Sequence, residues 1–279
     1  MKISKTQFIM SVLLIVVFVS IIASCNSIST QTYNIETPLL NAQSSIKIVL
    51  ISDLHSTIHG KDQTILIDKI KNINPDLIVL SGDIFDDEVP MTGTQLLLAG
   101  ISGIAPIYYV TGNHEYWSNN IQAIMDELAL YEVTILSDSY TIIEINNNEI
   151  IIAGIEDPDK RFYETTYNQN DSMENAFREL DEIQLFKILI AHRPELIENY
   201  KRFSFDLVLS GHTHGGQVRF LFINGLFAPN QGFFPKYAGG LYTHENLTHI
   251  ISRGLSINPR LPRIFNPPEL VVIIIEANP

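Results

Sequence analysis

Two hydrophobic periods alternate along most of the chain and predict alternating strands and helices. Short runs of apolar, mostly β-branched residues at 46–51 and 77–80 predict buried strands. Between them, isoleucines recur at near-helical spacing from residue 65 to residue 73, and Asn74-Pro75 ends this predicted helix. The other predicted helices span residues 91–101, 118–130 (with Ser118 as N-cap), 171–180 and 194–200. The other predicted strands span residues 107–110, 133–136, 141–145, 150–153, 187–191, 207–210, 217–223, 247–252 and 270–275.

After residue 216 the helical pattern stops, and strands separated by glycine- and proline-rich loops follow. The strands at 141–145 and 150–153 flank a polar turn and are expected to form a hairpin. Neither a repeat nor a linker interrupts residues 46–279. We therefore expect one α/β domain over residues 46–279, with two sheets and a β-rich C-terminal third.

The first 24 residues have the pattern of a targeting segment. Lys2 and Lys5 precede an apolar run over residues 8–23, which is near the length of a signal-peptide core and short for a spanning helix. Small residues then precede Cys25, the only cysteine, in a pattern that resembles the bacterial lipobox. Residues 1–24 are expected to be either a lipoprotein signal, with Cys25 lipidated, or an uncleaved signal anchor. Residues 25–45 are rich in Ser, Thr, Asn and Gln and are expected to form a flexible tether.

Composition limits the classes of function. The chain has 31 acidic and 18 basic residues and a formal net charge of −13, which argues against sequence-independent binding to nucleic acids. The single cysteine excludes an internal disulfide framework and a cysteine-based zinc site. A phosphorylated substrate must be attracted locally, because the overall field of the protein repels anions.

Five short polar clusters each follow a predicted strand. They are Asp53-Leu54-His55, Gly82-Asp83, Gly112-Asn113-His114-Glu115, His192 and Gly211-His212-Thr213-His214-Gly215. Asp53, Asp83 and Asn113 are spaced 30 residues apart, the length of one strand–helix–strand unit, so these clusters are expected to return to the same sheet edge. Carboxylate, imidazole and amide oxygen suit zinc, iron, manganese or nickel. Two such ions can activate a water molecule and neutralise a phosphoryl oxygen.

In this order, the clusters resemble the signature of the calcineurin-like metallophosphoesterase superfamily over about residues 46–276. The sequence GHTHGGQVRF at 211–220, with Arg253-Gly254-Leu255 and Pro267-Pro268-Glu269, is similar to small, membrane-associated bacterial members. The resemblance implies a two-sheet β-sandwich flanked by helices. It also implies one metal held by Asp53, His55, Asp83 and His214, and a second held by Asp83, Asn113, His192 and His212, with Asp83 as the bridge. His114 would face the leaving-group oxygen, oriented by Asp86 from the GDIFD stretch.

These implied roles agree with the chemistry of each side chain. A carboxylate between two cations stays ionised, as Asp83 would, whereas Asn113 offers only a neutral oxygen and limits the negative charge. His114 beside a ligand is suited to proton transfer, and a carboxylate such as Asp86 would fix its tautomer. The expected nucleophile is a hydroxide that bridges the two metals.

Several residues outside these clusters have two interpretations. Arg253 and Arg260 would either clamp a phosphate or headgroup, or form structural ion pairs. His59 could reach the cleft, but a solvated loop position is the simpler expectation. Tyr237 and the phenylalanines at 227, 233 and 234 could line a lipid groove, but a core position is the simpler expectation. His244 and His249 receive no role.

The expected activity is hydrolysis of a phosphodiester or pyrophosphate bond, on a lipid-linked or envelope-associated substrate because of the membrane anchor. A UDP-diacylglucosamine, suggested by membrane-associated relatives, fits only a domain on the cytoplasmic side, whereas a lipoprotein would be extracytoplasmic. A broad phosphomonoesterase or nucleotidase would use the same ligands. A non-catalytic binding module should lack a ligand or the acid, and here every ligand position and His114 are present.

Overall fold

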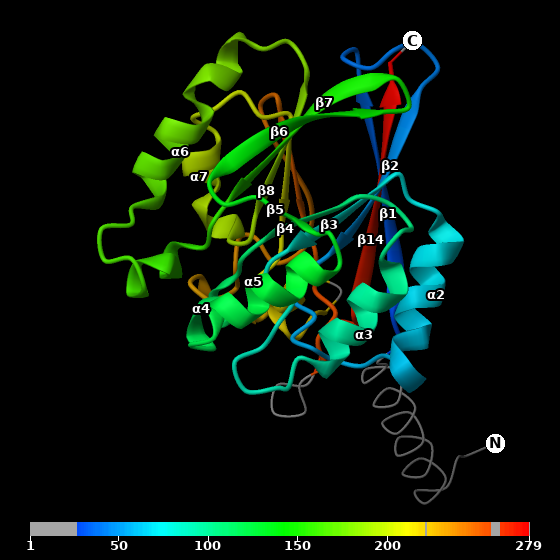
Figure 1. Ribbon diagram of the computed structural model, residues 1–279, viewed down its shortest axis with the longest axis vertical. Coiled ribbons are helices and arrows are strands. Elements are labelled where there is room, and N and C mark those ends of the chain that lie inside the picture. The colour runs from blue at the N-terminus through cyan, green and yellow to red at the C-terminus, as the bar shows by residue number, and fades with distance from the viewer. Residues whose placement is uncertain (1–26, 221, 258–262, 279) are drawn as a thin grey trace, which may run out of the picture.

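Two stacked sheets with helices on both outer sides form the structure, a computed structural model that describes residues 27–220, 222–257 and 263–278 (Figure 1). The first sheet has the order β1-β14-β2-β3-β4-β5. Its strands are β1 (Ser29–Thr37), β14 (Glu269–Ala277), β2 (Ser45–Ile51), β3 (Leu77–Ser81), β4 (Ile107–Val110) and β5 (Thr134–Ile135). The second sheet has the order β12-β13-β9-β8-β7-β6. Its strands are β12 (Gly240–His244), β13 (Leu247–Ile251), β9 (Leu207–Ser210), β8 (Phe186–Ala191), β7 (Asn148–Ile155) and β6 (Ser139–Ile145).

Helices cover the outer face of each sheet (Figure 1). The α-helices are α2 (Thr64–Ile73), α3 (Thr92–Ile101), α4 (Asn113–Trp117), α5 (Ile121–Leu130), α6 (Gln169–Phe177) and α7 (Ile197–Tyr200). The short 3₁₀ helices are η1 (Lys61–Gln63), η2 (Pro158–Phe162), η3 (Arg178–Glu182), η4 (Pro194–Leu196) and η5 (His214–Gly216). A separate hairpin pairs β10 (Phe227–Ala228) with β11 (Gly232–Phe233). In the part of the chain that the structure describes, no helix combines the length and the apolar character needed to cross a bilayer.

The core explains why the central strands are almost uninterrupted apolar runs. In β2, Ile48 and Leu50 pack between the two sheets, while Val49 and Ile51 pack against the helices on the outer face. Strands that are buried on both faces carry apolar residues at every position, as these do. A third apolar cluster, between the second sheet and α6 and α7, completes the four layers.

The two sheets meet at the edge where their parallel strands end. Strands β2, β3 and β4 are parallel neighbours in the first sheet, and β7, β8 and β9 are parallel neighbours in the second. Gly211, just after β9, approaches the end of β2 so closely that a Cβ there would lie 1.6 Å from Ser52 Oγ. Only glycine fits this contact, which brings the polar clusters of both sheets together.

The predicted fold class, a two-sheet sandwich flanked by helices within one α/β unit, is confirmed. The prediction of a flexible tether over residues 25–45 is wrong for Ser29–Thr37, which forms β1 and pairs in parallel with β14. Tyr33 and Ile35 of β1 are half-buried against the inter-sheet core, whereas the neighbouring Thr32, Asn34 and Glu36 are exposed. The domain therefore begins before residue 46. Residues 1–24, Cys25 and Arg260 lie outside the described residues.

Two local predictions also differ from the structure. The predicted strand at 217–223 is absent from its described residues, since Val218 and Phe220 make only isolated bridges and Gln217 has a positive φ of 59°. The predicted N-cap at Ser118 is wrong because α4 occupies Asn113–Trp117 and α5 begins only at Ile121.

Candidate metal centre

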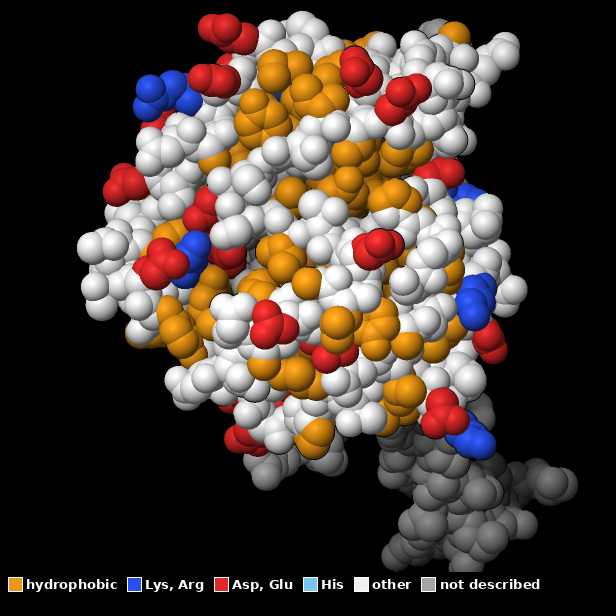
Figure 2. Space-filling view, viewed as in Figure 1, with side chains coloured by type: hydrophobic (Ala, Val, Ile, Leu, Met, Phe, Trp, Pro, Cys, Tyr) orange, Lys and Arg blue, Asp and Glu red, His pale blue; other side chains and the backbone are white. Residues whose placement is uncertain are grey.

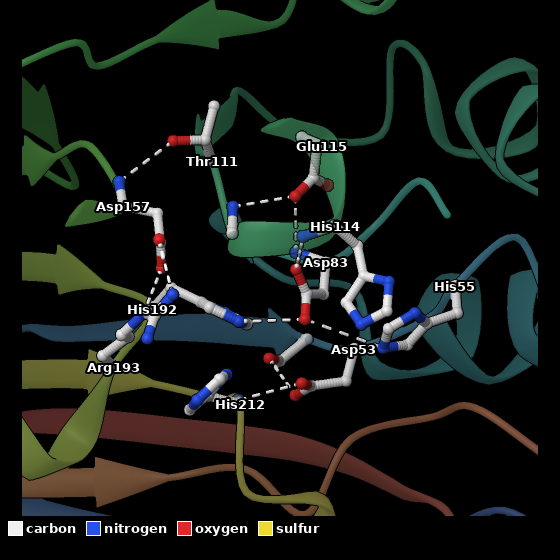
Figure 3. A network of polar contacts seen from close by, with 12 residues as sticks. Asp53, His55, Asp83, Thr111, His114, Glu115, Asp157, His192, Arg193 and His212 are labelled. Atoms are coloured by element: carbon white, nitrogen blue, oxygen red, sulfur yellow. Dashed lines mark hydrogen bonds and ion pairs between the residues drawn. The ribbon is translucent and has the colours of Figure 1, made fainter. Parts of the chain in front are cut away.

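All seven predicted metal ligands lie where the strands end, and Figure 3 shows Asp53, His55, Asp83, His192 and His212 among them. Asp53 and His55 follow β2, Asp83 follows β3, Asn113 follows β4, His192 follows β8, and His212 and His214 follow β9. Asp53, Asp83, Asn113, His192 and His212 are almost completely buried. The edge therefore gathers imidazole, carboxylate and amide groups out of contact with bulk water.

Two groups of possible ligands meet at Asp83. In one group, the ligand atoms of Asp53, His55 and His214 lie within 4.8 Å of one another, and in the other those of Asp83, His192 and His212 do. Asp83 Oδ2 lies 3.0 Å from His192 Nε2 and 3.7 Å from His55 Nε2. One oxygen of Asp83 thus faces both groups, as a bridging ligand requires.

Each histidine of these two groups has one ring nitrogen occupied by the protein. Nδ1–H of His55 donates to Asp86 Oδ2 at 2.7 Å, and Nδ1–H of His192 donates to the Ser81 carbonyl at 2.8 Å. Nε2–H of His212 donates to Asn230 Oδ1 at 2.8 Å, while Nδ1 of His214 lies 3.2 Å from Ser256 Oγ. Such outer contacts fix the tautomer of a metal-binding histidine and leave its other nitrogen available to the ion.

The atoms left over are the ones that a metal needs. His55 Nε2 and Asn113 Oδ1 are buried and make no hydrogen bond in the described part of the chain, and His192 Nε2 has only the Asp83 carboxylate beside it, at 3.0 Å. A buried polar atom without a partner costs about 1–3 kcal/mol, so two of them beside Asp83 and His192 call for a ligand. The residues present therefore fit metal ions.

The charges of the site favour a cation beside Asp83. Burial lowers the pKa of His192, but the negative charges of Asp83, Asp53 and Asp157 together outweigh burial and raise it to about 10. Burial, with His192 nearby, lowers the pKa of His212 to about 3, and burial also holds the pKa of His214 well below its ordinary value. His212 and His214 are thus neutral imidazoles, the form that binds metals.

Backbone strain is concentrated on these residues. Asp53, His55, Asp83, His212 and His214 all have positive φ angles, between 47° and 70°. The left-handed region costs a non-glycine residue roughly 1–2 kcal/mol, and such residues cluster at functional sites. Five of the seven predicted ligands carry this strain. The backbone of these loops therefore orients the side chains toward one another at a cost in stability.

The predicted pairing of Asp86 with His114 is wrong. Asp86 Oδ2 accepts from His55, and its Oδ1 accepts the N–H groups of Glu88 and Val89, each at 2.8 Å. These bonds hold the carboxylate 3.8 Å from His114 Nδ1, whereas Asp87 Oδ1 lies 2.5 Å from the same nitrogen. Asp87 is therefore the carboxylate that orients His114.

His114 itself is placed as predicted, next to the possible ligands. Its backbone N–H donates to Asp83 Oδ1 at 2.9 Å, and its ring packs against those of His55 and Trp117. The side chain is 24% exposed, more than that of His214, which is 15% exposed. It can therefore exchange a proton with a bound substrate.

Glu115 holds the loop of Asp83 to the helix of Asn113, a role that the sequence did not reveal. Its carboxylate is completely buried and accepts four backbone N–H groups, those of Asp83, Ile84, Phe85 and Gly112, at 2.8–3.1 Å. Figure 3 shows Glu115 beside Asp83. A single side chain thus positions two of the three loops from the first sheet.

A second buried network supports His192. The neighbouring Arg193 donates from Nε and Nη2 to the two oxygens of Asp157, at 2.7 and 2.9 Å, and Nη2 also lies 2.9 Å from Asp159 Oδ2. The N–H of Asp157 donates to Thr111 Oγ1, which ties the network to the end of β4 (Figure 3). These contacts therefore connect the loop after β8 to the loop after β7 and, through Asp157, to the end of β4.

The other residues singled out in the sequence lie apart from the metal ligands or have other partners. Arg253 forms an ion pair with Glu269, at 2.5 Å, so the structural interpretation holds and the predicted substrate contact is not supported. His59 is buried rather than solvated, and its Nε2 bonds the Leu255 carbonyl at 2.9 Å. Tyr237 is a core residue as expected, but the core prediction is wrong for the phenylalanines at 227, 233 and 234, which are exposed.

Comparisons with known proteins agree with this geometry. The sequence profile of the calcineurin-like phosphoesterase family matches residues 46–216, more than half of the chain. A protein of Bacillus subtilis strain 168, named uncharacterized protein YpbG, is 28% identical over 253 residues, covering 90% of this chain and 88% of that one. An uncharacterized metallophosphoesterase of Aquifex aeolicus is 28% identical over 255 residues, covering 88% and 91%. A bovine transmembrane protein with metallophosphoesterase domain is 26% identical over 252 residues, covering 85% of this chain and 54% of that protein.

Solved structures with the same fold have much lower sequence identity. The NAD nucleotidase of Haemophilus influenzae matches with a TM-score of 0.53 and 15% identity, over 77% of this chain and 46% of that one. The sulfate thiohydrolase SoxB of Thermus thermophilus matches with a TM-score of 0.50 and 12% identity, over 82% and 56%. This chain therefore spans about half the length of both structures, and the likeness concerns the fold.

Proposed function

The chain belongs to the calcineurin-like phosphoesterase family, and from this premise we propose that it hydrolyses phosphodiester or pyrophosphate bonds with two metal ions. Membership makes it a metal-dependent phosphoesterase. The number of ions, the kind of bond and the substrate are our proposal.

The position of Asp83 Oδ2 carries the two-metal proposal. This oxygen lies 3.7 Å from Nε2 of His55, which belongs to one ligand group, and 3.0 Å from Nε2 of His192, which belongs to the other. Asp53 and His214 complete the first set, and Asn113 and His212 complete the second. Manganese, iron, zinc and nickel all accept such ligands. Two ions bound here would supply an activated water and neutralise the phosphoryl oxygens.

The protein's own residues then divide the remaining work. Asp83 holds negative charge between the two positive sites, and Asn113 adds an oxygen without adding charge. His114 transfers a proton to the departing oxygen, held in place by the Asp87 carboxylate at Nδ1. No serine or cysteine nucleophile is required.

We further propose a lipid-linked or envelope-associated substrate. The apolar run at 8–23 and Cys25 support a membrane anchor, either as a lipoprotein outside the cytoplasm or as a signal-anchored protein. The name of the bovine relative, a transmembrane protein with a metallophosphoesterase domain, is consistent with an anchored arrangement. The surface carries more acidic than basic side chains on the face shown in Figure 2, so anionic substrates are attracted by the metal centre rather than by the surface.

The test is hydrolysis of bis(p-nitrophenyl) phosphate and p-nitrophenyl phosphate by the full chain in detergent with added manganese. The diester is expected to be cleaved, and His114→Asn is expected to lower the rate by about 10²–10⁴-fold with the metal content unchanged. His244→Asn, which lies outside the site, serves as the matched control and is expected to keep the rate. Cleavage of the monoester alone would replace the proposal with a phosphomonoesterase. Cleavage of neither ester would favour a non-catalytic module.

A further inference from the structure

Exposed phenylalanines gather beside the metal centre. Of the seven phenylalanines that are exposed in the described part of the chain, six belong to the region after η5 and one, Phe162, does not. We call these six the phenylalanine surface: Phe220, Phe222, Phe227, Phe233, Phe234 and Phe265. Phe222 is 97% exposed and Phe233 is 71% exposed, values that are unusual for side chains that cost so much to hydrate.

Local contacts order this surface. The rings of Phe220 and Phe265 lie 5.9 Å apart, and those of Phe227 and Phe233 lie 5.5 Å apart across the β10–β11 hairpin. The backbone N–H of Phe234 donates to the Leu226 carbonyl, which fixes the base of the hairpin. An ordered group of exposed aromatic side chains marks an interaction site more often than it marks a loose loop.

The phenylalanine surface borders the candidate metal centre. Asn230, in the turn between β10 and β11, accepts the hydrogen bond from His212 Nε2. Phe227 lies three residues before Asn230 in the sequence, and Phe233 lies three residues after it. Phe265 is next to Asn266, which donates to the His214 carbonyl at 2.7 Å. Whatever covers the phenylalanines therefore lies close to the ligands.

The described chain also begins at this edge. Ser29, the first residue of β1, donates from its backbone N–H to the Pro268 carbonyl, and its Oγ lies 3.2 Å from Arg253 Nη2. The residue after Arg253, Gly254, is so close to Asp53 that a Cβ there would lie 2.6 Å from the Asp53 Cβ. Only Arg253 and Gly254 thus separate the start of β1 from a predicted ligand.

The length of chain before Ser29 limits how far this edge can be from a bilayer. The apolar run ends at Ala23 and the lipidation candidate is Cys25, so either form of anchor is within six residues of Ser29. Six residues reach at most about 20 Å when fully extended. A domain of this size is roughly 45 Å across, so the chain is too short to let the opposite edge of the domain face the membrane instead.

We propose that the phenylalanine surface docks on the lipid bilayer that holds the N-terminal anchor, and that it presents the metal centre to phosphorylated lipid headgroups. The second part rests on the proposed function. Apolar side chains carry the docking, because the net charge of −13 gives no attraction to anionic lipids. Binding of the surface is therefore expected to change little with salt.

Quenching of tryptophan fluorescence by brominated phosphatidylcholine tests the docking without using activity. The full chain is placed in phosphatidylcholine nanodiscs as Phe222→Trp, Phe233→Trp and the control Leu130→Trp, and the signal of the single native Trp117 is subtracted. Leu130 is also well exposed, at 74%, but it ends α5 and leads to the start of β5, which is parallel to β4 and therefore begins at the edge opposite the metal ligands. We expect at least about threefold stronger quenching at 222 and 233 than at 130. The quenching should stay the same between about 0.05 and about 0.5 M salt, because salt screens attraction between charges but does not weaken apolar contacts.

Equal quenching at all three positions would overturn the docking proposal, even if the protein hydrolyses phosphoesters. Unquenched but blue-shifted emission at 222 together with a dimer in detergent would assign the surface to a second copy and would also overturn it. Strong quenching at 222 and 233 without hydrolysis of any ester would keep the docking and reject the proposed function.

Discussion

Replacement of Glu115 by glutamine tests whether one buried carboxylate organises the metal loops. Each of its oxygens accepts two backbone N–H groups: Oε1 from Ile84 and Phe85, and Oε2 from Asp83 and Gly112. Glutamine keeps one oxygen and places an NH₂ group opposite the other two donors. Two buried N–H groups then lose their acceptor.

The expected loss follows from these two groups. Each buried donor without a partner costs about 1–3 kcal/mol, so Glu115→Gln should lower the free energy of unfolding by about 4 kcal/mol. The same bonds tie the Asp83 loop to α4, so metal affinity should fall by about 10–100-fold, as for other outer partners of metal ligands.

Urea unfolding of the full chain in detergent, with a chelator present, measures the first effect separately from metal binding. The control is Glu149→Gln, on an exposed position of β7, which should change stability by less than about 0.5 kcal/mol. A loss below about 1 kcal/mol for Glu115→Gln would refute the reasoning, because it would mean that solvent or a rearranged loop satisfies the freed N–H groups.

Four further substitutions probe the surroundings of the site. Asp86→Asn should weaken metal binding about 10–100-fold, because Asp86 holds the ligand His55. Asp87→Asn should keep the metal and lower kcat, because Asp87 orients His114. Metal titration and steady-state kinetics measure the two effects, and the same result for both variants would contradict this division of roles. Burial lowers the pKa of His249 to about 3, so its contribution to stability is complete above pH 6.5 and is lost as the pH falls toward 3. His249→Gln should therefore flatten the fall in unfolding free energy between pH 6.5 and 5 by up to about 2 kcal/mol in urea titrations, and parallel curves would contradict this. Arg193→Met leaves Asp157 buried without its cation and should cost about 3–5 kcal/mol by the same assay, and a loss below about 1 kcal/mol would mean that the pair is not a buried anchor.

The central strands and the ligand clusters could be predicted because one physical cause determines both. Strands such as β3 and β8 are buried on two faces, so they are apolar throughout, and the polar residues that follow them stand out. Parallel strands end at a common edge, so clusters spaced by one strand–helix–strand unit had to meet there.

The parts that could not be predicted depend on contacts distant in sequence. β1 has a polar composition, and it is a strand only because β14, some 240 residues later, pairs with it. Asp86 turned to His55 because the N–H groups of Glu88 and Val89 fix its other oxygen, a loop geometry that spacing does not reveal. The exposure of Phe233 depends on how the β10–β11 hairpin packs beside η5, which the local sequence does not reveal.

The metal content of the purified full chain tests the central claim most directly. After dialysis against manganese and removal of free ions, mass spectrometry should find two ions per chain in the wild type and fewer than one in Asp83→Asn, because the bridging oxygen serves both groups of ligands. Asp126→Asn, on the exposed face of α5, should keep both ions. One ion or none in the wild type, or two ions retained in Asp83→Asn, would contradict a two-metal centre built around Asp83.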